Sequence, residues 1–335
     1  MSRKTIRICV VDTVYTLWLS LIKFGINQSD YFVFSTGIPE DIRKNFNHYF
    51  FPKTNVKFSK KSGRAISLSP KDLPGNLGHV FEILKLKRKL SSLTHNSDVK
   101  VYGHGHLKFS FPLYTWPDNA IVEDGFGNYN ELKKPTKFKY PRLAHFCGFY
   151  FKFFKQGFGT HENIHKICLT KENYPDIIKG KVEIMDVEAL WQQKSDAEKN
   201  QILELFNMQD IYDKFTDNST LLLTQSLSED DLLDYDEEIA IYRQFVEKYP
   251  DLIIKTHPRE TKDYREIFPD VTVIDTPFPI EMFKFLGIPV KKILTISSTA
   301  ALNFKGDADI ELYEGQTSRK KFNDSLKKFR EIYNE

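Results

Sequence analysis

The chain has 335 residues, of which 41% are hydrophobic, 14% aromatic and 28% charged. This composition excludes a disordered or fibrous protein, and the length exceeds what one ordinary core holds, so we expect two domains. Forty-eight Lys and Arg residues against 45 Asp and Glu leave a formal charge of only +3, which is too small for the molecule as a whole to bind nucleic acid.

Strand and helix patterns alternate from the N-terminus onward. Apolar runs that end in turn residues are typical of buried strands, and apolar faces with helical spacing indicate helices. In the first half these patterns predict strands at residues 6–11, 31–37, 99–105 and 120–125, and helices at 15–24 and 75–93. In the second half they predict strands at 221–226, 251–258, 271–275 and 291–298, and helices at 236–249, from near 280, and at 318–333.

Such alternation predicts an α/β fold with parallel sheets. We expect two Rossmann-like domains facing a cleft, one at residues 1–195 and one at 216–335, with a linking region near 190–215. Ligands of open α/β sheets bind at the carboxyl ends of the strands. Functional residues are therefore expected directly after the predicted strands.

The residues between 132 and 161 differ from the rest of the chain. They include seven Lys or Arg, no Asp or Glu, and nine Phe or Tyr. Aromatic rings and cations at this density are typical of a segment in the headgroup boundary of an anionic membrane. A core-facing helix or a dimer surface is the alternative.

Cysteine usage and hydropathy indicate the compartment. Cys9, Cys147 and Cys168 are far apart and follow neither a CxxC nor a His-rich pattern, so we expect no disulfide framework and no structural zinc. The chain has no uninterrupted run of about 18 apolar residues, so no ordinary transmembrane helix is predicted. A cytoplasmic protein is expected, with peripheral contact to the inner face of the membrane through residues 132–161.

The first candidate site is the tripeptide Glu123-Asp124-Gly125 at the end of an apolar strand. A carboxylate that points into a cleft from this position is suited to act as a general base. A turn with a solvated acidic pair is the alternative interpretation.

The second candidate site is Lys255-Thr256-His257-Pro258. Pro258 ends the strand and favours an extended shape for the residue before it, so His257 is expected at the rim, with Lys255 on the same face. An imidazole beside an ammonium suits an anionic leaving group such as a phosphate. A structural histidine is the alternative.

Two further candidates follow predicted strands. Ser297, Ser298 and Thr299 offer hydroxyls and backbone N–H groups to a phosphate, although a helix N-cap uses the same residues. The loop after the strand at 221–226 brings Asp230 and Asp231 toward the expected cleft. A polar loop that caps the next helix is the alternative for these two carboxylates.

Metal-binding patterns are weak. The stretches 234–236 and 307–309 both read Asp-X-Asp, but so short a pattern arises easily by chance, and we interpret both as solvated loops. His104 and His106 lack a third ligand at a fixed spacing. The sequence therefore predicts no metal, and a contact with substrate for His104.

In combination, EDG, KTHP and the Ser pair resemble the D/E-D/E-G, HP and Ser-Ser/Thr motifs of bacterial sialyltransferases, in the same order. The phrases TQSLSED, IIKTHPRE and PFPIEMF resemble glycosyltransferase family 52, most clearly from about residue 221 to 303. Members of that family include lipooligosaccharide and capsule sialyltransferases. The resemblance implies a GT-B-like fold, CMP-sialic acid as donor bound by the C-terminal domain, a galactose-terminated acceptor, inversion, and neither metal nor cofactor.

The resemblance also implies roles for individual residues. His257 matches the HP histidine, which would contact the donor phosphate and act as acid or charge stabiliser, supported by Lys255. Ser297 and Ser298 match the phosphate-binding pair, and Glu281 is similar to the carboxylate that holds the ribose hydroxyls. The expected donor-binding set is completed by Gly125, Pro258 and Thr299.

The catalytic base stays open between the two halves. The wider bacterial sialyltransferases imply Glu123 or Asp124, whereas family 52 also implies a carboxylate of the second half, here Asp230 or Asp231. We place it at Asp230 and keep the others as alternatives.

Two other functions stay open. The chain could be a polysialyltransferase or another GT-B nucleotide-sugar transferase, or a non-catalytic nucleotide or glycan binder. A homodimer is plausible from the family, and nucleic acid is not expected as a partner.

Overall fold

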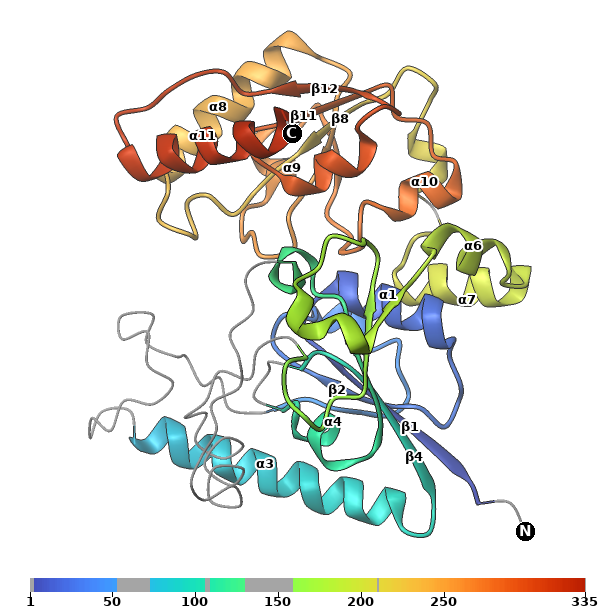
Figure 1. Ribbon diagram of the computed structural model, residues 1–335. Helices are drawn as coiled ribbons and strands as arrows, with labels where there is room; N and C mark the ends of the chain where they lie inside the picture. Colours follow the sequence, from blue (N-terminus) through green and yellow to red (C-terminus); the bar gives the residue numbers. More distant parts are fainter. Residues whose placement is uncertain (1–2, 53–72, 106–108, 130–158, 210, 335) are drawn as a thin grey trace. The chain divides into compact units, whose positions relative to one another are not determined.

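The computed structural model describes residues 3–52, 73–105, 109–129, 159–209 and 211–334, and the chain divides into two compact units, Met1–Ile202 and Leu203–Glu335 (Figure 1). Most of the segment 132–161, together with Cys147 and His106, lies outside the described residues. No helix in the described ranges is both long enough and apolar enough to cross a bilayer.

The first unit is built on a seven-stranded sheet in the order β3-β2-β1-β4-β5-β6-β7, in which every neighbouring pair is parallel. Its core is formed by the apolar strand residues that the alternating pattern predicted, among them Ile8, Val101 and Ile121. The strands are β1 (Thr5–Val11), β2 (Tyr31–Phe34), β3 (Tyr49–Phe50), β4 (Asp98–Gly103), β5 (Asp118–Val122), β6 (Lys166–Leu169) and β7 (Val182–Ile184).

Helices connect these strands. Thr13 caps the first of them, because its hydroxyl accepts a hydrogen bond from the Thr16 N–H at 3.2 Å. Ile83, Leu86 and Leu90 pack the long third helix on the core. The helices of this part are α1 (Val14–Phe24), α2 (Glu40–Arg43), α3 (Leu73–Thr94), α4 (Phe111–Thr115), η1 (Gly125–Asn128), η2 (Asp176–Lys181), α6 (Val187–Gln192) and α7 (Asp196–Leu205).

The second unit contains a five-stranded parallel sheet in the order β10-β9-β8-β11-β12. Leu222, Ile254 and Leu294 of three adjacent strands pack with Tyr242 and Phe322 in its core. Its elements are η3 (Tyr212–Lys214), β8 (Thr220–Leu223), α8 (Tyr235–Lys248), β9 (Ile253–Lys255), α9 (Tyr264–Ile267), β10 (Thr272–Ile274), α10 (Met282–Leu286), β11 (Lys292–Thr295), η4 (Thr299–Phe304), β12 (Asp309–Leu312) and α11 (Lys320–Asn334).

The aspartates of the two Asp-X-Asp stretches are exposed to solvent as predicted, but the prediction that both stretches are loops is wrong. Asp234 precedes α8, and its N–H donates to the Glu237 carboxylate at 2.9 Å, so this stretch is a helix N-terminus. Asp309 begins β12 and pairs with Lys292 of β11 at 2.8 Å. Short acidic runs occur in first helical turns and at strand edges as well as in loops, which explains the error.

Both sheets change the direction of strand addition beside their first strand. β1 lies between β2 and β4, and β8 lies between β9 and β11. The loops that leave the carboxyl ends of β1 and β4, or of β8 and β11, therefore run to opposite sides of the sheet and open a crevice, where α/β proteins bind ligands.

Candidate active site

In the first unit, His104 and Asp124 form a tight pair. His104 follows β4, Asp124 lies two residues beyond β5, and His104 Nε2 lies 2.5 Å from Asp124 Oδ1. The imidazole is fully buried, whereas the Asp124 side chain keeps 17% of its surface exposed. Asp124 is therefore the solvent-facing member of a pair whose other member is fixed in the protein.

Contacts from β1 and α1 determine the tautomer of His104. The backbone N–H of Asp12 donates to Nδ1 at 3.0 Å, so a neutral ring carries its proton on Nε2, the atom that faces Asp124. The Thr16 hydroxyl lies 3.1 Å from the same Nε2 and donates to the Glu123 carbonyl at 2.6 Å. His104 thus presents an N–H to Asp124 in a fixed orientation.

Gly103 permits this arrangement at the junction of β1 and β4. Its φ is +123°, and a Cβ at this position would lie 2.0 Å from the Val10 carbonyl oxygen. Only glycine fits here. The next residue, His104, can therefore donate its backbone N–H to the same Val10 oxygen at 2.7 Å.

Glu123 has a different environment from its neighbour Asp124. Its buried carboxylate accepts hydrogen bonds from the Tyr129 hydroxyl at 2.5 Å and from the Thr170 N–H and hydroxyl at 2.6 and 2.7 Å. The Tyr15 hydroxyl donates to the other oxygen at 3.2 Å. Burial and the nearby Glu123 charge raise the pKa of Tyr129. Glu123 thereby joins β5 to the end of β6. Its oxygens are occupied by these hydrogen bonds, so it is poorly placed to take up the proton of a hydroxyl group on an acceptor.

In the second unit, His257 is held as a neutral hydrogen-bond donor. Burial, with the positive charges of Arg259 and Lys255, lowers the pKa of His257 to about 4. The Arg259 N–H donates to Nδ1 at 3.2 Å, which leaves the proton on Nε2. The backbone N–H of His257 donates to the Glu260 carboxylate at 2.7 Å, and this hydrogen bond fixes the backbone of the loop.

Lys255 is a buried cation at the last position of β9. Its Nζ donates to the Thr256 carbonyl at 2.8 Å and lies 4.8 Å from the centroid of the Phe278 ring. Within the described part of the chain it forms no ion pair, and burial lowers its pKa to about 8, against the opposing charges of Glu260 and Asp275. A buried ammonium without a carboxylate partner favours binding of an anion.

The family resemblance implies CMP as a ligand of this site, and on that basis we expect its affinity to fall by about ten-fold from pH 7 to pH 9. Lys255 loses its charge in this interval because its pKa lies near 8, and a site that requires the ammonium loses a factor of ten per pH unit above that value. Calorimetric titration of CMP at constant ionic strength measures the change. Lys255→Met should bind weakly with no such slope, and a wild-type affinity that is constant from pH 7 to 9 would rule out Lys255 as a phosphate ligand.

The Ser pair lies at the crevice between β8 and β11. The backbone N–H and hydroxyl of Ser297 both donate to the side-chain oxygen of Gln225, at 2.8 and 3.1 Å. The Ser298 N–H donates to the Thr295 hydroxyl at 3.0 Å, and the Ser298 hydroxyl makes no capping hydrogen bond. The helix that follows is the single short 3-10 segment η4, which begins at Thr299, so little dipole from a helix is available here.

Asp230 and Asp231 occupy different surroundings in the loop after β8. The Arg259 guanidinium donates to both oxygens of Asp230 at 3.1 and 2.9 Å, and the Ser226 hydroxyl adds a contact at 3.1 Å. Asp231 is exposed, with a φ of +57°. The bidentate pair joins this loop to the loop that carries His257.

A second, buried ion cluster holds the same two loops together. Lys262 Nζ lies 2.8 Å from Glu229, 3.0 Å from Glu238 and 3.8 Å from Glu260. Only 3% of the Lys262 side chain is exposed. Burial alone would lower the pKa of Lys262, but hydrogen bonds to Glu229 and Glu238 more than offset this and raise it.

Lys262→Met should lower the free energy of unfolding of the second unit by about 3–5 kcal/mol, because it leaves the buried carboxylates of Glu238 and Glu260 and the partly exposed one of Glu229 without their cation. Urea denaturation is followed by circular dichroism. Tryptophan fluorescence would not report on the second unit, because Trp18, Trp116 and Trp191 all lie in the first unit. Lys248→Met is the control. Its pair with Glu311 involves a side chain that is 59% exposed, so we expect a much smaller loss. Equal small losses would contradict the prediction.

Glu281 is the residue before α10, and Pro258 and Gly125 shape their loops. The Glu281 carboxylate accepts a hydrogen bond from the Asn303 side chain at 2.7 Å, which joins α10 to η4 just beyond the Ser pair. Pro258 is exposed beside His257, and Gly125 has a φ of +74° where the chain turns into η1.

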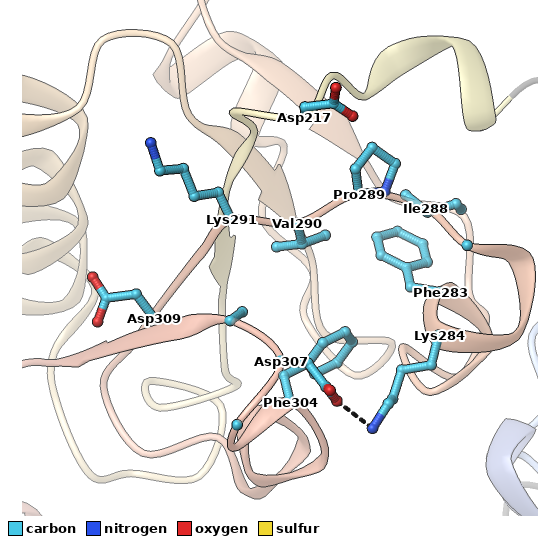
Figure 2. A pocket seen from close by; sticks show the side chains of 13 residues that line it. Asp217, Phe283, Lys284, Ile288, Pro289, Val290, Lys291, Phe304, Asp307 and Asp309 are labelled. Carbon is cyan, nitrogen blue, oxygen red and sulfur yellow. Dashed lines mark ion pairs between the residues drawn. The ribbon is translucent and has the colours of Figure 1, made fainter.

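A pocket of about 650 Å³ lies elsewhere in the second unit (Figure 2). Phe283, Ile288 and Val290 line it, with an ion pair between Lys284 and Asp307 at its edge. The residues Lys291 and Asp309, which stand at the amino ends of β11 and β12, also line it. This pocket thus belongs to the end of the sheet opposite to His257 and the Ser pair, and we do not assign the chemistry to it.

The structure groups the residues predicted from the sequence into two clusters, one in each unit. His104, Asp124 and Glu123 meet at the ends of β4 and β5, while Lys255, His257 and Asp230 meet beyond β8 and β9. Sequence reasoning missed five residues that hold these groups in place. They are Asp12, Thr16, Gln225, Arg259 and Glu260.

Asp12 and Gln225 could have been found from their position in the sequence. Asp12 is the residue after the first strand of its sheet, β1, and Gln225 is the second residue after β8. Arg259 and Glu260 follow the histidine motif but have no distinctive spacing. Among the residues that the structure describes, no three His, Cys, Asp or Glu side chains are grouped so that they could hold a metal ion.

Comparison with known proteins identifies the family. The model of Glycosyltransferase family 52 matches residues 30–317. An uncharacterized protein of Haemophilus influenzae is 35% identical over 239 residues, which are 70% of this chain and 72% of that protein.

Solved sialyltransferases share the fold. The α/β-galactoside α-2,3-sialyltransferase of Photobacterium phosphoreum matches with a TM-score of 0.53 and 13% identity, over 99% of this chain and 96% of that one. The GT-B domain of the Photobacterium damselae sialyltransferase gives 0.53 and 12%, over 98% and 97%. These likenesses show a GT-B fold, and the family match confirms the resemblance drawn from the EDG, KTHP and Ser-pair motifs. The chain belongs to glycosyltransferase family 52.

Proposed function

We propose that this family 52 glycosyltransferase is an inverting, metal-independent sialyltransferase that moves sialic acid from CMP-sialic acid to a terminal galactose. The observation that carries the proposal is made at the end of β9, where the buried ammonium of Lys255, the last residue of the strand, and the neutral donor His257 are two residues apart. Two such donors suit the phosphate of a nucleotide that carries a single phosphate group. A capsule or lipooligosaccharide acceptor is part of the proposal and follows from the family resemblance.

The donor phosphate would be bound by Lys255, His257 and the hydroxyl of Ser298. Lys255 supplies a full positive charge in a buried position, where it acts more strongly than in water. His257 Nε2 supplies an N–H, and the Ser298 hydroxyl has no capping role that would occupy it. These groups would neutralise the negative charge that develops as the nucleotide leaves, which is the task that a metal ion performs in other transferases.

The transfer is a direct displacement at the anomeric carbon of sialic acid. The galactose hydroxyl oxygen forms the new bond to that carbon, and the bond from the carbon to the phosphate oxygen breaks and leaves its electron pair on CMP. The hydroxyl proton passes to a carboxylate. Attack on the face opposite to the leaving group inverts the configuration.

We assign the carboxylate that accepts this proton to Asp124 in place of Asp230. Asp124 is partly exposed and is oriented by a neutral histidine N–H, an arrangement that aligns a carboxylate without adding a positive charge. Both oxygens of Asp230 face the guanidinium of Arg259, and a cation that must be displaced makes a carboxylate a poorer proton acceptor.

Release of CMP tests the proposed function. The purified protein is mixed with CMP-sialic acid and lactose, with and without EDTA, and with UDP-galactose and UDP-N-acetylglucosamine as alternative donors. We expect turnover with CMP-sialic acid that EDTA leaves unchanged. Turnover with a UDP-sugar alone would assign another donor, and loss of turnover in EDTA would refute metal independence. Binding of CMP without release of CMP from CMP-sialic acid, whichever galactoside is present, would favour a non-catalytic binder.

A further inference from the structure

Helix α3 of the first unit presents an apolar face to solvent. Phe81 is 66% exposed and Leu84 is 49% exposed, and these are two of the five large apolar side chains that the described residues expose. They lie three positions apart, so they stand side by side on the helix surface. Because single exposed apolar residues are ordinary and adjacent ones are not, this pair marks a contact surface.

The opposite face of the helix fixes its position. Ile83, Leu86 and Leu90 have no exposed surface and belong to the core of the first unit, and Glu82 is buried beside them. With about 100° per residue, these buried positions lie on the other side of the helix axis from Phe81 and Leu84. The exposed pair therefore belongs to a helix that is firmly packed on the sheet, which is visible in Figure 1 as the long cyan helix.

The charges around the pair have one sign. Lys85 and Arg88 are exposed on the same side of α3, and the half-buried Lys87 and the exposed Lys89 lie on its two flanks. The helix contains a single carboxylate, that of Glu82, which is buried and pairs with Lys85 at 3.0 Å. The surface next to Phe81 and Leu84 is accordingly positive, with no exposed acidic side chain on the described part of the helix.

We propose that this face of α3 binds the surface of an anionic phospholipid bilayer. Rings and branched chains of this kind enter the boundary between headgroups and acyl chains, and Lys and Arg extend their long stems so that the charge meets lipid phosphate. A protein partner would need acidic side chains opposite the cations and a far larger complementary area. Phe81, Leu84, Arg88 and Lys89 are the contact residues, and the proposal is independent of the proposed chemistry.

Vesicle flotation with the full chain tests this surface. Wild-type protein is mixed with vesicles of phosphatidylglycerol and phosphatidylcholine, or of phosphatidylcholine alone. The salt concentration is about 100 mM, which screens charges that are far from the membrane. We expect binding to the anionic vesicles only. Arg88→Gln/Lys89→Gln should lower the partition coefficient by roughly twenty-five-fold, because each cation near an anionic surface contributes about five-fold. Phe81→Ser/Leu84→Ser should lower it by at least about ten-fold.

Matched variants on the second unit separate this surface from general charge and stickiness. Lys327→Gln/Lys328→Gln removes two exposed cations from α11, and Tyr235→Ser removes a side chain that is 50% exposed at the start of α8. Both should float like the wild type. Equal losses in α3 and control variants, unchanged binding of the α3 variants, or no binding of the wild type would each overturn the proposal. CMP release with soluble lactose should be normal in the α3 variants, so a loss of release in these variants would indicate misfolding. Absence of CMP release in the wild type would contradict the proposed chemistry and would not bear on the membrane surface.

Discussion

Asp124→Asn should lower kcat for transfer to lactose by about 10²- to 10⁴-fold, the range expected when a positioned general base is removed. The amide keeps the size of the side chain and its contact with His104, whereas it cannot accept the acceptor proton. Because the proposal assigns the donor phosphate to other residues, the dissociation constant of CMP should stay within about two-fold. Initial rates of CMP release, with CMP binding measured separately, give both quantities.

Two variants control for this prediction. Asp118→Asn removes a carboxylate at the exposed start of the same strand, where it pairs with Lys100 at 3.8 Å, and should be nearly as active as the wild type. Asp230→Asn should lose far less activity than Asp124→Asn, since it weakens the contact with Arg259 and removes no base. The reverse order, with Asp230→Asn nearly inactive and Asp124→Asn active, would move the base to the second unit, where the sequence first placed it.

His257→Ala should lower kcat by about 10²- to 10³-fold, which is the usual cost of removing one donor that stabilises developing negative charge. The pKa of His257 is near 4, so at pH 7 the ring is neutral and acts through its Nε2–H. Single-turnover release of CMP isolates this step from product release.

His257→Asn and His165→Ala complete this experiment. Asn retains a side-chain N–H donor and should recover part of the activity, and the exposed His165 has no role in the proposed site. A His257→Ala variant with normal turnover would remove His257 from the mechanism. Equal loss in both alanine variants would indicate damage to the protein instead.

The regular architecture was predictable because its strands are strongly apolar. The runs TLLL and KILT are the strands β8 and β11 of the second unit, and the helices α8 and α11 lie within about two residues of their predicted bounds. Strands β3, β6, β7 and β12 were missed, and β3 and β7 are only two and three residues long. β6 is four residues long and follows the unusual aromatic segment, and β12 alternates acidic and apolar residues at a sheet edge, so neither resembles a buried strand.

The sites were predictable in location and not in detail. The sequence placed His257, Lys255 and the Ser pair at strand ends because strand ends are visible as apolar runs that stop. It could not distinguish Glu123 from Asp124, since the difference comes from Tyr129 and Thr170, which reach only Glu123 across the fold. Neither could it foresee that Arg259 faces Asp230, because that contact depends on the conformation of two loops.

If Lys255 binds the donor phosphate as proposed, its buried ammonium makes proton exchange part of donor recognition. Its pKa of about 8 means that part of the protein population lacks this proton in mildly alkaline solution. A phosphate that arrives beside Lys255 favours the charged form, so binding should draw a proton from the solvent. The heat of CMP binding should consequently vary with the ionisation enthalpy of the buffer, most strongly above pH 8, and a transfer cycle would take up a proton when the donor enters and return it when CMP departs.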